Sequence, residues 1–145
     1  MRNVLNNLKP EVLERDGLEA ALREMTENLD QIDGFSCRLV IEDDVPSFDE
    51  TVELNIYRLV QECLTNVVKH AGAQNSSVRL TKKDARDGMY MIAVKDDGVG
   101  FFPKKENLGV GIPSMNDRVR MLGGKFDVYS MEGKGTEVIM EIPYQ

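Results

Sequence analysis

The chain has 145 residues, of which 41% are hydrophobic and 30% charged, so it has about the length and the composition of one ordinary globular domain. Its net charge of -7 at pH 7 argues against nucleic acid as the main partner, because phosphate backbones bind basic surfaces. No apolar run approaches the roughly 20 residues that cross a bilayer, and the N-terminus lacks a signal-peptide core. We therefore expect a cytoplasmic protein, or the cytosolic part of a membrane-anchored one, with no membrane contact of its own.

The first residues of the chain predict a helix that stops early. Val4, Leu5 and Leu8 recur at helical spacing, and Pro10 interrupts the pattern. We expect residues 1–9 to be the tail of a preceding helix or linker, and residues 10–145 to form one domain.

A second helix is predicted after this proline. Asp16-Gly17-Leu18-Glu19 has the spacing of a capping box, with Asp16 as the N-cap. One apolar stripe follows it: Leu18, Ala21, Leu22, Met25 and Leu29. Gly34 ends this region. Cys37, Leu39 and Ile41 then alternate with polar residues and predict a half-buried strand.

The longest periodic segment is a helix that Asp49 can cap and that runs to about Ala71. Its broad apolar face consists of Val52, Ile56, Leu59, Val60, Cys63, Leu64 and Val67. Cys63 belongs to this face, and neither it nor Cys37 has metal-ligand spacing. Both are therefore predicted to be reduced, packed thiols of a cytosolic protein.

The second half of the chain predicts two pairs of strands around one short helix. The first pair, 78–82 and 90–94, is joined through Asp87-Gly88, which favours a hairpin. Pro113 opens the helix, and Gly123-Gly124 ends it. The second pair, 126–131 and 136–142, flanks Gly133-Lys134-Gly135. The pattern predicts one α+β domain with helices on one face of a mostly antiparallel sheet.

Four polar residues lie along the margin of the apolar face of the long helix. At α-helical spacing Glu62, Asn66, Lys69 and His70 share one side. A carboxylate, a carboxamide and a cation at this place suit a divalent cation and a phosphate chain, since Mg²⁺ prefers oxygen ligands. The alternative is a solvated helix flank.

Glycines recur in three Gly-x-Gly units: Gly98 and Gly100, Gly109 and Gly111, and Gly133 and Gly135. Glycine lets the backbone approach a ligand closely and present N–H donors to an anion. Each unit alone is also explained as a turn or a hairpin. Together, with the first unit directly after a strand-ending acid, they favour an anion-binding role.

Asp96 continues the alternation of Tyr90, Ile92 and Val94, so its side chain lies on the same face of the predicted sheet. A carboxylate there needs a hydrogen-bond donor, and an adenine amino group would supply one. The alternative is that Asp96 caps the turn at Gly98 through an Asx bond.

The order of these residues resembles the motifs of the GHKL ATPases. The N box, G1 box, G2 box and G3 element correspond in turn to Gln61-Glu62-x-x-x-Asn66-x-x-Lys69-His70-Ala71, Asp96-x-Gly98-x-Gly100, Gly109-x-Gly111 and Gly133-x-Gly135-Thr136. The chain is most similar to sensor histidine kinases that signal to LuxR-type response regulators. This narrower match rests on Tyr57-Arg58-Leu59, Met115-x-x-Arg118-Val119 and Leu122-Gly123-Gly124. The resemblance covers about residues 8–143 and implies a Bergerat-type two-layer α/β sandwich.

The resemblance implies ATP and Mg²⁺ as ligands and a role for each motif residue. Asn66 would coordinate Mg²⁺, Glu62 would hold a metal-bound or reacting water, and Lys69 and His70 would face phosphate oxygens. Asp96 would accept from the adenine amino group, with Thr136 close by through water. The glycines would shape the pocket, at Gly98 and Gly100, and its lid, at Gly109 and Gly111.

The chain departs from the family pattern in the lid. Residues 101–108 leave no room for the separate F box of longer-lidded kinases, which is typical of the resembled subgroup. Ile112-Pro113-Ser114 stands where that subgroup more often has Leu-x-Gly. Lys104 and Lys105 could reach a phosphate, although a charged pair in a loop is more often only solvated.

The acceptor of the phosphoryl group is absent from the motifs. His70 is the one histidine, and it lies in the predicted nucleotide helix, so the resemblance implies a phosphoacceptor on a separate histidine-bearing dimerisation domain. We expect this chain to be monomeric and unable to phosphorylate itself. Two alternatives are a GHKL serine kinase that acts on a protein switch and a nucleotide-binding interaction module without turnover.

Overall fold

Five strands form one mixed sheet in the order β1-β2-β3-β5-β4. The computed structural model describes residues 10–84, 88–98 and 112–144. In chain order the elements are α2 (Glu11–Asp16), α3 (Leu18–Asp30), β1 (Ser36–Ile41), α4 (Glu50–Asn66), η1 (Val67–Ala71), β2 (Asn75–Asp84), β3 (Met89–Asp96), α5 (Ile112–Met121), β4 (Lys125–Met131) and β5 (Gly135–Pro143). Only the β1–β2 pair is parallel, and the other neighbouring strands are antiparallel.

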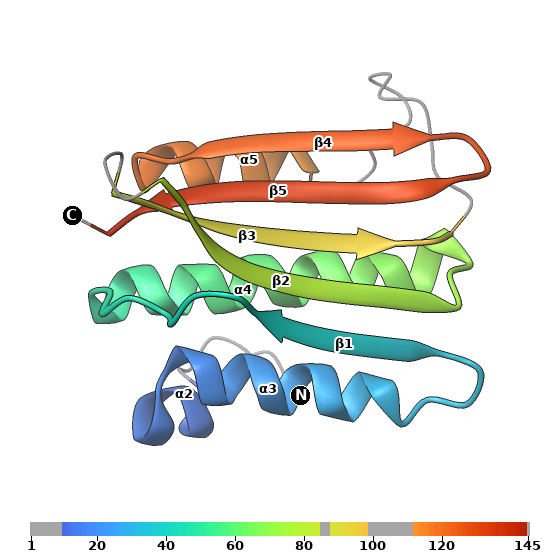
Figure 1. Cartoon of the computed structure of the whole chain (residues 1–145), viewed down its shortest axis with the longest axis horizontal. Coiled ribbons are helices and arrows are strands. Elements are labelled where there is room, and N and C mark those ends of the chain that lie inside the picture. Colours follow the sequence, from blue (N-terminus) through green and yellow to red (C-terminus); the bar gives the residue numbers. More distant parts are fainter. Residues whose placement is uncertain (1–9, 85–87, 99–111, 145) are drawn as a thin grey trace.

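The helices lie on one side of this sheet (Figure 1). In that view α4 and α5 run behind the strands, and α3 lies alongside β1. The predicted α+β sandwich, with helices on one face of a mostly antiparallel sheet, is therefore confirmed. No helix among the described residues is long and apolar enough to cross a membrane.

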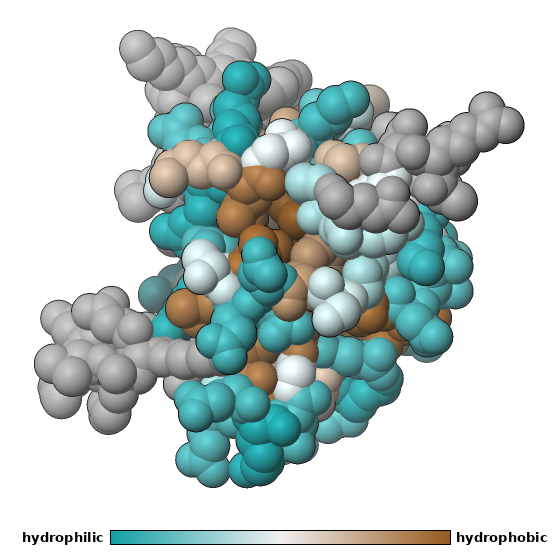
Figure 2. Space-filling model, turned by 90° about the vertical axis from the view of Figure 1, so that its left-hand side faces the viewer, coloured by the Kyte–Doolittle hydropathy of each residue, from teal (hydrophilic) through white to brown (hydrophobic). Residues whose placement is uncertain are grey.

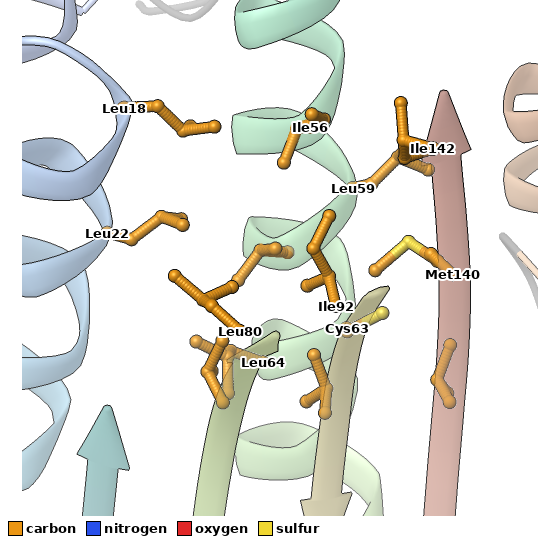
Figure 3. Close-up of a cluster of buried hydrophobic side chains, with 14 of the residues drawn as sticks. Leu18, Leu22, Ile56, Leu59, Cys63, Leu64, Leu80, Ile92, Met140 and Ile142 are labelled. Atoms are coloured by element: carbon orange, nitrogen blue, oxygen red, sulfur yellow. The ribbon is translucent and has the colours of Figure 1, made fainter. Parts of the chain in front are cut away.

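The core forms where the predicted apolar faces meet. Figure 3 shows side chains of α3 and α4 directed toward those of β2, β3 and β5. Ile56, Leu59 and Val60 of α4 are fully buried, as are Ile92 and Ile142 of the sheet. Burying a side chain of this size contributes roughly 1.5–3 kcal/mol, so the α4 face is a main source of stability.

Polar side chains surround this core at the surface. Figure 2 looks at the left-hand end of the molecule in Figure 1, where apolar side chains gather in the middle and polar ones enclose them.

The two cysteines, Cys37 and Cys63, are free and buried, which confirms that they are packed thiols. Burial raises the pKa of Cys63 to about 12, so this thiol stays protonated.

The predicted capping box at Asp16 is wrong. Asp16 is the last residue of α2, a helix that the sequence analysis did not predict, and its carboxylate accepts from Arg15 Nε at 2.9 Å. Pro10 occupies the N-cap position of this helix, where a proline costs no helical hydrogen bond because the N–H groups of the first turn are unpaired. The helix predicted before Pro10, in residues 1–9, lies outside the described residues. Gly17, at φ 93°, joins α2 to α3.

The other element boundaries agree with the sequence pattern to within a few residues. Asp49 occupies the N-cap position of α4, although its side chain makes no capping hydrogen bond. Each of the four strands β2, β3, β4 and β5 is one or more residues longer than predicted. Gly123 closes α5 at φ 82°, where its N–H donates to the carbonyl of Arg120 at 2.9 Å.

The long helix extends to Ala71 as predicted, but its last turn is not α-helical. Residues 67–71 form a π-turn, and Gly72 follows it in the left-handed conformation at φ 63°. In a π-turn hydrogen bonds join residues five apart, so the α-helical spacing rule does not extend into η1. Such turns occur frequently at functional sites.

Candidate functional site

Three of the predicted motifs meet at one end of the molecule. The end of α4 with η1, the end of β3 and the start of β5 all lie on the right-hand side of Figure 1. The pairing of β3 with β5 places Asp96 opposite Thr136. The fold therefore joins the acid of the first glycine motif to the threonine of the last, which lie far apart in the sequence.

A row of polar residues crosses the sheet at this end. The strand register pairs Ser76 with Asp96, Asp96 with Thr136, and Thr136 with Ser130. Residues two apart on a strand lie on the same face of a sheet, so these four residues face the same side as the apolar core residues of their strands. Ser76 and Asp96 are each only 6% exposed. The apolar core thus ends in a polar row that can accept or donate hydrogen bonds.

Asp96 is buried and partly satisfied by the protein. The backbone N–H of Gly98 donates to its Oδ1 at 2.8 Å, so the Asx bond that was the alternative interpretation is present. A carboxylate offers about four lone-pair positions, and this bond leaves others for a further donor. Burial raises the pKa of Asp96, while the N–H groups of Gly98 and Thr136 oppose that shift.

Ser130 lies beside Thr136 and contacts its hydroxyl group. The two hydroxyl oxygens are 3.0 Å apart, and Ser130 Oγ also donates to the carbonyl of Gly135 at 3.3 Å. Sequence analysis missed Ser130 because nothing in its surroundings forms a motif. Only the pairing of β4 with β5 shows that it borders the predicted site.

Gly135 lies where the first and the last glycine motifs approach each other. A Cβ at this position would lie 2.1 Å from the backbone oxygen of Asp96, and its φ of 98° disfavours other residues. Glycine is therefore required here for close contact between β5 and the end of β3. The interpretation of this unit as an ordinary hairpin turn does not explain that contact.

Glu62 and Asn66 lie one turn apart near the end of α4, and both are half-buried. Glu62 Oε2 is buried and has no hydrogen-bond partner among the described residues. A buried carboxylate oxygen without a donor is costly, and in native structures it indicates a missing water, ion or ligand. The free carboxylate oxygen of Glu62 could accept a hydrogen bond from a Mg²⁺-bound water, and the carboxamide oxygen of Asn66 could bind the metal ion itself.

Lys69 is exposed and lies in the π-turn. Its predicted alignment with Glu62 and Asn66 assumed α-helical spacing, which the π-turn does not keep. The backbone of His70 belongs to the same turn, and its side chain lies outside the described residues. The prediction that these residues share one side of the helix is therefore supported for Glu62 and Asn66, and it stays a prediction for Lys69 and His70.

Several predicted site residues lie outside the described residues. They are Gly100, Gly109 and Gly111, together with the two lysines Lys104 and Lys105. Gly98 is described and buried, and its N–H is engaged by Asp96.

A second acid in the first glycine motif was also missed. Asp97 Oδ1 accepts from the backbone N–H groups of Gln74 and Asn75, both at 2.9 Å. Its Oδ2 accepts from Asn75 Nδ2 at 2.7 Å. These hydrogen bonds join the end of β3 to the segment after η1, and they hold the pKa of Asp97 below its usual value. The one signal in the sequence is that Asp97 directly follows Asp96.

The chain belongs to the family described as histidine kinase-, DNA gyrase B-, and HSP90-like ATPases, whose model matches residues 51–145. It is 30% identical over its whole length to an uncharacterized sensor-like histidine kinase of Chloroflexus aurantiacus, of which it covers 25%. It is 33% identical over 99% of its length to the sensor histidine kinase LiaS of Bacillus subtilis, of which it covers 39%. The chain thus spans well under half of the length of these relatives.

A solved structure supports the same family. The histidine kinase domain of the blue-light activated histidine kinase of Erythrobacter litoralis EL346 superposes with a TM-score of 0.69 and 26% identity. The match covers 88% of this chain and 61% of that one. The identification of a sensor histidine kinase ATPase domain from its motifs is confirmed.

Proposed function

We propose that this chain binds Mg-ATP across the site end of the sheet and donates the γ-phosphoryl group to a histidine of a separate dimerisation domain. The observation that carries the proposal is the buried Oε2 of Glu62, which has no hydrogen-bond partner among the described residues. The end of α4 that bears Glu62 lies at the same end of the molecule as the end of β3 that bears the buried carboxylate of Asp96. One is an open acceptor for a metal-bound water, and the other is an acceptor for the amino group of a base.

The proposed roles divide the nucleotide between two parts of the fold. On α4 and η1, Asn66 coordinates Mg²⁺, Glu62 orients a metal-bound or reacting water, and Lys69 and His70 face the phosphates. Bound Mg²⁺ would supply charge neutralisation of the phosphate oxygens. These groups act by position and charge, since phosphoryl transfer asks little covalent chemistry of the protein.

On the sheet, Asp96 accepts from the adenine amino group, and Thr136 holds a water beside the ring. The contact between Thr136 and Ser130 orients the threonine hydroxyl for that task. Gly98 and Gly100 shape the pocket, and Gly109 and Gly111 hinge the lid over the phosphates.

The acceptor histidine must come from another domain, because His70 is the one histidine of the chain and belongs to the nucleotide helix. We infer that the full-length protein is a two-component sensor kinase whose catalytic part works in the cytoplasm and whose signal passes to a LuxR-type response regulator. The chain alone would bind ATP without phosphorylating itself.

Calorimetry with a non-hydrolysable ATP analogue tests nucleotide binding. Asn66→Ala and Asp96→Ala should each lower the affinity about tenfold to a hundredfold, since a hydrogen bond to a charged group contributes roughly 1.5–3 kcal/mol. Asn66→Ala should also lose the dependence on Mg²⁺. The matched controls are Asn55→Ala, near the start of the same helix, and Asp127→Ala, on the exposed side of β4. A folded wild-type chain that binds no nucleotide would refute the proposal.

Transfer is tested by mixing the chain with a separately produced, histidine-bearing helical domain and ATP labelled in the γ-phosphoryl group. We expect acid-labile label on that domain and none on the chain itself. Acid-stable phosphoserine on another protein, without acid-labile label, would favour a serine kinase of the same superfamily.

A further inference from the structure

Asp97 connects two segments that are distant in the sequence. Its carboxylate accepts three hydrogen bonds from Gln74 and Asn75, at 2.7–2.9 Å. Its own N–H donates to the carbonyl of Asn75 at 3.1 Å. The end of β3 and the start of β2 are therefore joined by both the backbone and the side chain of one residue.

The joined segment leads directly into the π-turn. Residues 72–74 are all that separates η1 from β2. Gly72, at φ 63°, reverses the chain at one end, and Asp97 holds the other end. The carbonyl of Gln74 also accepts from the N–H of Ser36 at 2.8 Å, so β1 holds this connection from the opposite side. A segment this short transmits a shift at Gln74 to the turn that carries Lys69.

We propose that Asp97 is a positioning residue that holds η1, and with it Lys69 and Asn66, at a fixed place relative to Asp96. This inference rests on the proposed function, in which a nucleotide contacts both parts. Asp97 itself touches no ligand in this arrangement. It acts through Gln74 and Asn75 on the groups that do.

A positioning role predicts different effects on ligands that reach one part or both parts of the site. Adenosine would contact only the sheet side, near Asp96, whereas Mg-ATP would also contact α4 and η1. Loosening the connection at Gln74 lets η1 take several positions, so Mg-ATP must then pay an added ordering cost. Adenosine binding does not order η1 and should be nearly unaffected.

The experiment compares Asp97→Ala with the wild-type chain, using a Mg-bound ATP analogue in calorimetry and adenosine in an NMR titration. We expect the affinity for the ATP analogue to fall about tenfold. A loss of this size corresponds to about one hydrogen bond between the misplaced η1 region and a charged phosphate oxygen. The affinity for adenosine should change by less than about twofold. Asp127→Ala, which removes an exposed carboxylate from β4, is the control and should change neither affinity.

Two further variants separate positioning from folding. Asp97→Asn keeps an oxygen that accepts from the backbone N–H groups of Gln74 and Asn75, so it should retain most of the affinity for the ATP analogue. Asn75→Ala removes only the hydrogen bond to Oδ2 and should have an intermediate effect. Amide hydrogen exchange at Gln74 and Asn75 should be faster in Asp97→Ala.

The outcomes are distinct. An equal loss for both ligands, or an unchanged affinity despite faster exchange at Gln74 and Asn75, overturns the positioning role. A wild-type chain that binds neither ligand overturns the proposed function, and this inference with it, before any variant is compared.

Discussion

Asp96 is a carboxylic acid that is almost fully buried, with only 6% of its surface exposed. Alternation along β3 predicts its position, since Tyr90, Ile92 and Val94 face the core on the same side. The structure adds the bond from Gly98 and the neighbouring Thr136. The turn-capping role and the proposed adenine contact are therefore compatible, because they use different lone pairs of one carboxylate.

The raised pKa of Asp96 predicts a dependence of stability on pH. Burial penalises the ionised form in the folded state, so the folded protein holds this proton at pH values where the unfolded chain has lost it. The contribution of Asp96 to stability is thus greatest below its ordinary pKa of 3.8 and is lost as the pH rises through the raised value. Asp96→Asn lacks this titration.

Urea unfolding at several pH values checks this prediction. The free energy of unfolding of the wild-type chain, relative to that of Asp96→Asn, should fall as the pH rises through that window. All other titrating groups are common to both proteins and cancel in the difference. A difference that is constant with pH, or that grows with it, would contradict the predicted direction.

At the scale of elements, the hairpin between β4 and β5 contains two glycines with different tasks. Gly133, at φ 78°, has no atom within 4 Å of the place where a Cβ would lie. Gly135, at φ 98°, lies against the backbone of Asp96. The sequence shows the same residue type at both places, and only the packing of β5 on β3 tells them apart.

Alanine at these two positions should therefore have unequal effects. Gly133→Ala should lower the free energy of unfolding by about 1–2 kcal/mol, the cost of a left-handed conformation. Gly135→Ala adds overlap with the carbonyl of Asp96, so its loss should exceed that of Gly133→Ala by about 1–3 kcal/mol. Chemical denaturation of the two variants measures both. Equal losses would mean that β5 can move away from β3 without cost.

The end of α4 is the element that local periodicity describes least well. The apolar spacing continues to Val67, which is buried, and so the extent of the helix was predicted correctly. The wider π-turn from Val67 to Ala71 leaves no mark in that spacing. Glu62 and Asn66, inside the α-helical part, keep the predicted relation. Whether Lys69 lies on the same side of the helix as these two residues depends on the geometry of the π-turn.

At the scale of the whole molecule, ligand binding should be visible as stability. A ligand at about 100 times its dissociation constant stabilises the folded state by about 2.7 kcal/mol. For a domain of about this size each kcal/mol raises the melting temperature by roughly 2–4 °C, so we expect a rise of about 5–10 °C with a Mg-bound ATP analogue.

Differential scanning calorimetry with matched nucleotides measures this rise. The guanine analogue should give a smaller shift, because its ring presents a carbonyl oxygen where adenine donates to Asp96. In Asp96→Ala the shift with the adenine analogue at the same concentration should fall to about half or less, as the predicted loss of affinity requires. Equal shifts with the two analogues would indicate that Asp96 does not contact the base.

Most of the elements follow from local patterns. Apolar residues at helical or alternating spacing locate α3, α4, α5 and the strands, because backbone geometry fixes which side chains share a face. The motif order likewise indicated the family. The exception is α2, which was not predicted: Asp16 was interpreted as the N-cap of the following helix, whereas it ends α2, a helix whose Leu13 is buried in the core.

The site itself depends on contacts between residues that lie far apart along the chain. The insertion of β5 between β3 and β4 places Thr136 beside Asp96 and Ser130 beside Thr136. The antiparallel pairing of β2 with β3 brings Gln74 within reach of Asp97. No local spacing encodes these neighbours. They arise because the apolar faces of the helices and of the sheet must be buried together, while every strand completes its backbone hydrogen bonds. Only the folded chain meets both conditions at the same time.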